Sequence, residues 1–226
     1  MPLPLRHTHP WDLAPREAIE VQRKFAPEVR VEPLHAQPST VVGLDVSVRG
    51  DRVRAAGVVT ETEGWTPLAT AIWEGPVAFP YVPGLLSFRE IPALLPVLDD
   101  LATQRGSMPD VLMLDAHGLA HPRRFGLACH LGVLLDRPAL GVAKKRFVGT
   151  YDEPGPDKGA QSLLMHQDEV IGTVLRTRTR VKPVFVSAGH RITLEEATAL
   201  SLRAAMRTKL PEPNRLAHRL SYRGAL

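Results

Sequence analysis

Two aspartates lie where the chain is otherwise apolar, and their placement could create a metal site. Asp45 stands in the middle of the run VVGLDVSV, where alternation puts it on the same face as Gly43 and Ser47. A charge buried there is costly unless it is paired or metal-bound. Asp115 ends the run DVLMLD, and active sites gather at the carboxyl ends of parallel strands. If these two strands pair, the two carboxylates lie side by side, which is stable mainly with a cation between them.

Each candidate also has a purely structural interpretation. Asp45 could lie on a solvent face, and Asp115 could form a turn or cap the next helix. Glu90 is a third candidate carboxylate, but it completes the spacing S-x-x-E with Ser87, and local sequence favours a helix-capping box there. His190 follows a strand in VFVSAGHR and is either a hydrogen-bonding loop residue or a general acid or base.

The chemistry of this carboxylate set indicates a hard cation. Carboxylates without cysteine partners prefer oxygen-loving ions, so we expect Mg²⁺, with Mn²⁺ as a possible substitute. Such ions activate water and neutralise charge on a phosphodiester. The one cysteine, Cys129, lies in an apolar stretch and is expected to be a small core residue.

The first half of the chain predicts a helix, an antiparallel meander, a loop and a second helix. Apolar spacing and turn signals support these elements. The expected helices are 12–29 and 87–104, the strands begin at Val41, Val53 and Trp65, and the loop is 74–84.

The second half predicts alternating buried strands and helices. The strand that ends at Asp115 is followed by a helix in RRFGLACHLGVLLD and a strand from Ala139, an order that implies a crossover. After an exposed loop at 150–159 come two strands, VIGTVLRTRTRVK and VFVSAG, and a helix capped by Thr193. The expected fold is α/β, a mixed sheet flanked by helices, with residues 1–226 forming a single domain.

Composition limits the class of protein. The chain has 226 residues, of which 44% are hydrophobic and 23% charged, as in ordinary globular proteins. The net charge of +4 and the pI near 9.5 hint at a nucleic-acid partner. Neither a signal peptide nor a membrane span is evident, so we expect a cytoplasmic protein without a membrane partner, acting as a monomer.

Five segments together resemble the endonuclease V family of deoxyinosine-specific nucleases. They are VVGLDVS, PYVPGLLSFRE, DAHGLAHPRRFGLACHLGVLLD, PALGVAKKR and FVSAGHRIT, and their order and spacing fit across roughly residues 10 to 215. The resemblance implies a ribonuclease H-like fold and hydrolysis of the second phosphodiester bond 3′ to a deaminated base in DNA. It also implies that Asp45, Asp115 and Glu90 bind the metal, and that His190 and Lys144 assist at the same centre.

The resemblance further implies how damaged DNA is held. Tyr81 matches the residue that the family wedges into the duplex, and two prolines stiffen its loop, so its ring could replace lost base stacking. The expected DNA-binding set is Tyr81, Pro80, Pro83, Arg89, Lys145 and Arg123, and the expected base pocket is Gly84, Leu85, Leu86, Ala116 and Gly118. Many relatives have D-G-x-G where this chain has Asp115-Ala116-His117-Gly118, a difference that concerns the base pocket and therefore the substrate range.

A run of basic residues gives a further prediction. Arg176, Arg178, Arg180 and Lys182 recur at every second position, so on an extended strand they would share one face. That face would be either a phosphate-binding stripe or a charged edge strand that resists aggregation. Arg124, beside Arg123, is another candidate phosphate contact.

Two other functions fit parts of the pattern. Some relatives act on RNA, so an inosine-specific endoribonuclease is the first alternative, because recognition of a flipped base is similar in either polymer. The second is a catalytically silent nucleic-acid-binding module. Retention of the three carboxylates and His190 argues against that module.

Overall fold

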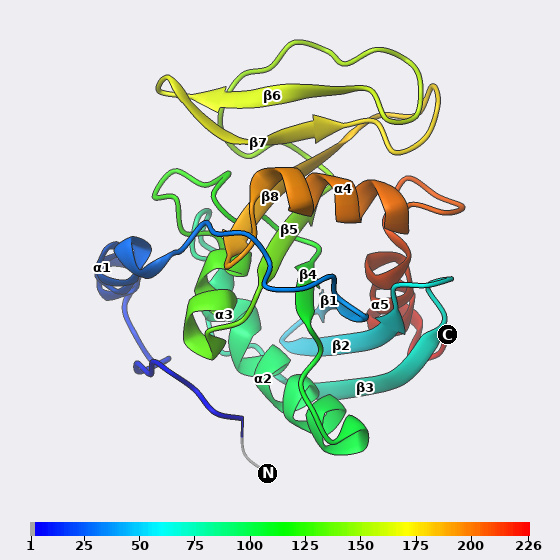
Figure 1. The fold of residues 1–226 in the computed structure, drawn as a ribbon. Helices are drawn as coiled ribbons and strands as arrows, with labels where there is room; N and C mark the ends of the chain where they lie inside the picture. The colour runs from blue at the N-terminus through cyan, green and yellow to red at the C-terminus, as the bar shows by residue number, and fades with distance from the viewer. Residues whose placement is uncertain (1–2) are drawn as a thin grey trace.

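One sheet organises the chain. The computed structural model describes residues 3–226, so the first two positions of the expected 1–226 domain lie outside the description. Within these residues eight strands form a mixed sheet in the order β3-β2-β1-β4-β5-β8-β7-β6, with helices on both faces (Figure 1). The predicted fold class is confirmed. In the same residues no helix is both long and apolar enough to cross a bilayer.

The first three strands form the predicted antiparallel meander. They are β1 (Thr40–Arg49), β2 (Arg52–Glu61) and β3 (Pro67–Pro76). Gly50 occupies the tight turn after β1 with a φ of 62°, a left-handed conformation that glycine adopts without the clash of a side chain. β1 pairs with β2 along its whole length, from Thr40 with Glu61 to Arg49 with Arg52, so β1 is held rigidly where the site begins.

A parallel crossover continues the sheet on the other side of β1. It consists of β4 (Val111–Leu114), α3 (Leu127–Leu135) and β5 (Ala139–Ala143). β4 pairs in parallel with both β1 and β5. All nine residues of α3 are buried, Cys129 among them, which confirms that this cysteine is a core residue.

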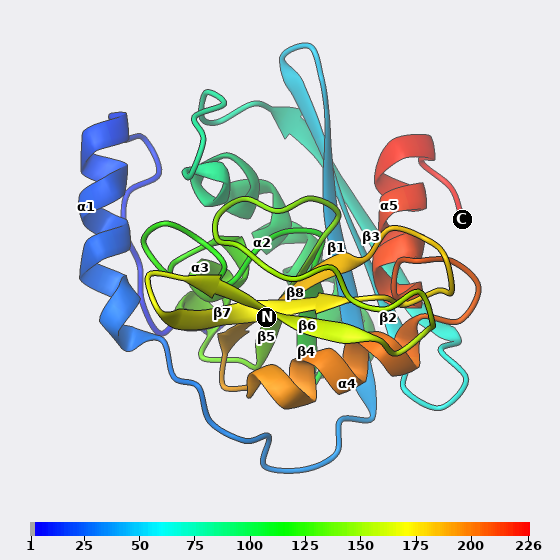
Figure 2. The same cartoon turned by 90° about the horizontal axis from the view of Figure 1, so that it is seen from above.

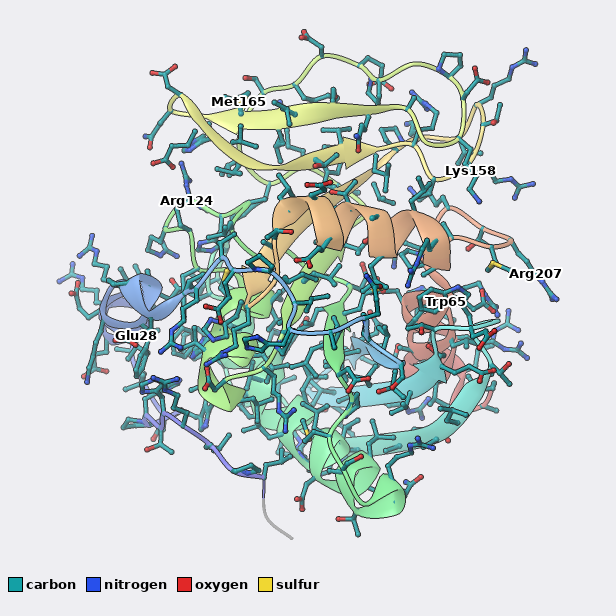
Figure 3. All side chains as sticks on the ribbon, viewed as in Figure 1. Glu28, Trp65, Arg124, Lys158, Met165 and Arg207 are labelled. Atoms are coloured by element: carbon teal, nitrogen blue, oxygen red, sulfur yellow. The ribbon has the colours of Figure 1, made fainter. Side chains whose placement is uncertain are left out.

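The far part of the sheet differs from the prediction in two ways. β8 (Val184–His190) pairs with β5, and β7 (Glu169–Leu175) joins β8 to an edge strand, β6 (Gln161–His166), that the sequence did not predict. β7 also ends at Leu175, before the basic run. Arg124 lies below this hairpin (Figure 3) and donates hydrogen bonds to Glu169 and to the His166 carbonyl.

The predicted basic stripe is wrong. Arg176 is 7% exposed because its guanidinium binds the carbonyls of Gly155, Pro154 and Val181 and the Glu153 carboxylate. It therefore ties the preceding loop to the chain after β7 and does not face solvent. The next alternate residue, Arg178, donates to the Arg207 carbonyl, and Arg180 has a φ of 61°. No extended face unites these residues.

Two pairs of helices cover the sheet. On one face lie α2 (Leu86–Arg105) and α3, and on the other lie α4 (Leu194–Ala204) and α5 (Glu212–Arg223) (Figures 1 and 2). A further helix, α1 (Pro15–Phe25), lies outside α3 and is followed by the short helix Ala26–Glu28. Thr193 caps α4 as predicted, accepting from the Glu196 backbone. α5 was not predicted, and it lies against β1 and β2.

Candidate active site

Asp45 and Asp115 lie on neighbouring strands, as their spacing predicted. Leu44 of β1 is level with Leu114 of β4, and the Asp115 backbone amide donates to the Leu44 carbonyl over 3.2 Å. The two aspartates follow these residues at the same end of the sheet. Their side chains are 10% and 9% exposed, so each carboxylate is largely removed from water and needs a partner.

Helix α5 supplies partners that the sequence analysis missed. His218 Nδ1 lies 3.2 Å from Asp45 Oδ2, and the Ser221 hydroxyl donates to the same oxygen. The helix can approach because Gly43 has no side chain: a Cβ there would lie 2.1 Å from the Pro213 carbonyl. The strand alternation therefore serves two purposes. Gly43 allows α5 to pack closely, and Asp45, two residues later on the same face, contacts the side chains of α5.

A signal for His218 was present in the sequence. Leu216 and Leu220 are spaced as one apolar stripe of a helix, and both are buried. His218 and Ser221 stand beside that stripe. The sequence prediction has its last helix begin near Thr193 and contains no separate helix around His218.

Charge at the site is only partly balanced by the protein. Lys144, which follows β5, places its Nζ 2.5 Å from Asp115 Oδ2. Burial nevertheless raises the pKa of Asp115, against the opposing effect of Lys144. Burial, with the nearby Asp45 and Asp115 carboxylates, raises the pKa of Glu90 well above its usual range. The site therefore favours positive charge, as a cation-binding centre does.

The ligand atoms of this group suit a divalent cation. One atom each from Asp45, Asp115 and His218 lie within 4.8 Å of one another. Carboxylate oxygens suit hard ions such as Mg²⁺ or Mn²⁺, and His218, 3.2 Å from Asp45 Oδ2, is placed to orient that carboxylate. Glu90 is outside this group of three, although its carboxyl is close enough for Asp45 and Asp115 to raise its pKa. The residues present therefore fit a metal.

The capping role predicted for Glu90 is wrong. α2 begins at Leu86, and its N-cap is Leu85, which makes no side-chain capping bond. Ser87 is thus already inside the helix, and its hydroxyl pairs with His130 Nδ1 over 2.9 Å. With no cap to form, the Glu90 side chain is free for the carboxylate group.

His190 is not brought to the carboxylates, which corrects its expected position. It pairs with Ala139 at the start of β5, and Ala139 is level with Leu112, three residues before Asp115. Its Nε2 lies 3.2 Å from Asp136 Oδ1 and its Nδ1 accepts from the Arg30 amide. The side chain is buried and links β8 to the loops beyond α1 and α3. Sequence order suggested convergence, but the antiparallel direction of β8 carries His190 to the opposite end of the sheet.

A cavity of about 220 Å³ lies next to the carboxylate group. It is connected to that group through the chain, because Ala116 follows Asp115 and Lys145 follows Lys144. Its size suits a small flat ring more than a drug-sized ligand. The lining residues are Gln22, Tyr81, Val82, Pro83, Gly84, Leu86, Ser87, Ala116, His117, His121, Gly126, Leu127, Lys145, Arg146 and Phe147.

Most of the expected pocket residues do line this cavity. Gly84, Leu86 and Ala116 are on its wall, as are Tyr81 and Pro83. The other two expected residues are not. Leu85 is buried with Phe79 and Phe88. Gly118 bonds to the Ser187 hydroxyl and faces the β8 backbone.

Residues from three other segments fix the rim of the cavity. The Gly84 carbonyl accepts hydrogen bonds from Gln22, His121 and Arg123, at 2.9, 3.0 and 2.8 Å. Gly84 has a φ of 84°, which a residue with a side chain rarely adopts. Arg89 donates to the Phe79 carbonyl on the same loop. Arg123 and Arg89 therefore bind protein groups that hold the loop in place.

The loop presents Tyr81 to solvent. Its side chain is 71% exposed, although the neighbouring Phe79 and Leu85 are buried in the core beneath it. An exposed ring on a loop anchored from both sides is available to a partner. Lys145 is likewise exposed at the same rim.

Comparison with known proteins agrees with this geometry. The family model described as Endonuclease V matches residues 23–219. The chain belongs to the endonuclease V family. It is 46% identical to the endonuclease V of Methanothrix thermoacetophila over 220 residues, which cover 97% of this chain and 96% of that protein.

Solved endonuclease V structures share the fold. The crystal structure of the Streptomyces avermitilis protein matches with a TM-score of 0.88 and 41% identity, over 95% of this chain and 94% of that one. A Ciona intestinalis endonuclease V, in complex with a 24mer DNA containing an inosine followed by a ribo-adenosine, matches with a TM-score of 0.81 and 25% identity, over 92% and 96%. The mixed sheet flanked by helices is therefore shared with solved structures of the endonuclease V family.

Proposed function

We propose that this protein is a DNA-repair endonuclease that recognises deaminated purines, above all deoxyinosine, and hydrolyses the second phosphodiester bond 3′ to the lesion. The observation that carries the proposal is the cluster of Asp45, Asp115 and His218, next to a ring-sized cavity, in a chain of the endonuclease V family. The inosine-containing DNA bound by the Ciona intestinalis relative supports the same substrate. The chain acts as a monomer and as a single domain.

The carboxylates would hold a divalent cation, and Mg²⁺ is the ion we propose. Asp45 and Asp115 would bind it directly, with Glu90 completing the negative charge and His218 fixing Asp45. The chemistry that Mg²⁺ would supply there is activation of a water molecule and neutralisation of charge on the phosphate. Lys144 can exchange its bond to Asp115 for a phosphate oxygen of the cut strand, because its side chain is one-third exposed at 34%.

Tyr81 and the cavity would hold the damaged nucleotide. A base that leaves the duplex loses its stacking, and an inserted aromatic ring replaces part of it. The hydrogen bonds on the Gly84 carbonyl keep the loop in place while the ring inserts. Lys145 is exposed at the rim and would contact the backbone of the strand.

An inosine-specific endoribonuclease remains the second candidate. The observation that favours it is the ribo-adenosine after the inosine in the nucleic acid bound by the Ciona intestinalis relative. A silent binding module is disfavoured because the cluster is complete. The test uses DNA duplexes and RNA strands of one sequence, each with a single inosine, and maps the cut position. The DNA-repair function predicts faster cutting of the DNA at the second bond 3′, and preferential cutting of RNA would reverse the ranking.

A further inference from the structure

A chain of hydrogen bonds connects the wall of the cavity to the N-terminal segment. Ser87, which lines the cavity, pairs with His130 Nδ1 over 2.9 Å. His130 Nε2 lies 2.8 Å from His9 Nε2, and His9 Nδ1 lies 2.7 Å from the Pro10 carbonyl oxygen. None of these hydrogen bonds involves the carboxylate group.

The last acceptor of this chain sets the direction of every bond. The Pro10 carbonyl can only accept, so His9 Nδ1 carries a hydrogen. Burial lowers the pKa of His9 and lowers that of His130 well below its usual value, so both rings are neutral at pH 7. A neutral imidazole has one N–H, and His9 Nε2 is therefore an acceptor. His130 must donate from Nε2, which leaves its Nδ1 to accept from the Ser87 hydroxyl.

The Ser87 hydroxyl can therefore act toward the cavity only as a hydrogen-bond acceptor. His130 is fully buried behind Ser87, so the Ser87 hydrogen points away from the cavity wall. What Ser87 can offer to a molecule in the cavity is a lone pair. Aromatic rings hold the His130 ring in this orientation: Trp11 stacks on it at 5.7 Å, and Phe88 meets it edge-on at 5.1 Å.

We propose that Ser87 is a specificity-determining residue that accepts a hydrogen bond from the N1–H of a deaminated purine, and that His130 is the positioning residue that fixes its polarity. The proposal rests on the proposed function. Hypoxanthine carries a hydrogen on N1, whereas adenine has a lone pair there. A site that accepts a hydrogen bond at N1 therefore favours the deaminated base, because adenine would leave two acceptors facing each other.

The chain of bonds also uses a residue outside the matched part of the family. His9 lies before residue 23, where the match to the family model begins. His9 fixes the direction of the hydrogen bonds from the N-terminal segment. This segment packs along α3, where the Arg6 amide donates to the Leu134 carbonyl. The N-terminal segment thus contributes to base selection without entering the cavity.

The test compares two duplexes that differ only in one base. One duplex carries hypoxanthine and the other carries unsubstituted purine, whose N1 has a lone pair and no hydrogen. Affinity for each is measured by competition, and kcat/KM is measured on the hypoxanthine duplex. In Ser87→Ala we expect affinity for hypoxanthine to fall about five- to tenfold, with affinity for the purine duplex unchanged or increased. Equal losses on both duplexes, or no loss on either, would overturn the proposal.

A matched pair at His130 separates polarity from packing. His130→Asn keeps an acceptor toward Ser87 and is expected to retain most of the preference for hypoxanthine. His130→Phe fills the space but removes the acceptor, and should lose the preference as Ser87→Ala does. Thermal unfolding identifies a variant that fails to fold, and Ser87→Ala then decides the question. If the wild type itself does not prefer the hypoxanthine duplex to an undamaged one, the proposed function fails, whereas a wild-type preference that survives in Ser87→Ala overturns this inference alone.

Discussion

The Lys144 ammonium lies 2.5 Å from the Asp115 carboxylate at the end of β4. Lys144 thus supplies a positive charge from the protein to a group of carboxylates that favours a cation. Asp115 is almost fully covered, while Lys144 is one-third exposed, at 9% and 34%. Two functions of Lys144 can therefore be separated by experiment: neutralising Asp115 without metal, and contacting the substrate when metal is bound.

Lys144→Met should lower the stability of the metal-free protein more than that of the Mg²⁺-loaded protein. Removing the ammonium leaves a covered carboxylate unpaired, at a cost of about 1 kcal/mol for a partly exposed pair. A bound cation takes over that role, so the difference in Tm from wild type should shrink when Mg²⁺ is added. Lys145→Met, at the exposed neighbouring position, is the control and should change neither value. A Tm difference that Mg²⁺ leaves unaltered would contradict this account of Lys144.

His218 and His190 should behave in opposite ways when replaced by alanine. His218→Ala removes the partner of Asp45, so cleavage should fall by about 10- to 100-fold, as for residues that orient metal ligands, with little change in Tm. His190→Ala removes a buried link to Asp136 and Arg30, so it should lower Tm while folded molecules keep their activity. Rates per folded molecule separate the two effects. Loss of activity in His190→Ala at unchanged Tm would restore the expectation drawn from the sequence.

The cavity wall should make the protein sensitive to acid. Burial lowers the pKa of both His117 and His121 to about 4, whereas an unfolded histidine titrates near 6.5. The unfolded chain therefore binds more protons between these values, so stability is full above about pH 6.5 and is lost as the pH falls toward 4. Each ring contributes up to about 3 kcal/mol over this range.

The measurement is urea unfolding at a series of pH values between 7 and 4. The variant His117→Asn/His121→Gln should show a flatter loss of stability than wild type across this range, and His35→Gln, at an exposed histidine, should not. Parallel curves for the double variant and the wild type would contradict the assignment of this effect to the cavity.

Tyr81→Ala should impair the choice of damaged over undamaged duplex more than it impairs metal binding. Stacking of a base on an aromatic ring contributes about 1–3 kcal/mol, so discrimination should fall roughly tenfold or more. Because the ring is 71% exposed, Tm should hardly change. Tyr81→Phe keeps the ring and serves as the matched control. Unchanged discrimination in Tyr81→Ala would remove Tyr81 from its proposed role as a wedge.

Local patterns predicted much of the fold and the two aspartates. Alternation in β1 placed Asp45 on the opposite face of the strand from Leu44, and the apolar run before Asp115 identified a buried parallel strand. These predictions succeeded because both patterns depend on near neighbours in sequence and on burial. The basic run after Leu175 failed for the opposite reason. Its alternation resembles a strand, but Arg176 is held by carbonyls from a distant loop, which no local pattern reveals.

The remaining site residues depend on contacts between distant segments. His218 reaches Asp45 because Gly43 allows α5 to pack closely, and neither residue indicates this alone. His190 looked suitable because it follows a strand, but the direction of β8 was set by pairing with β5. Ser87 has the sequence spacing of a helix cap, but its hydroxyl pairs with His130 of α3, a contact that local sequence does not reveal.

Cleavage of a duplex with a single deoxyinosine, with and without Mg²⁺, tests the central claim most directly. The wild type is expected to cut at the second phosphodiester 3′ to the lesion only when Mg²⁺ is present. Asp115→Asn should remain folded and lose cleavage at least a thousandfold (about 4 kcal/mol of transition-state stabilisation), while Asp51→Asn, at an exposed turn, should cut normally. Cutting by the wild type without a divalent cation, or near-normal turnover in Asp115→Asn, would contradict the account.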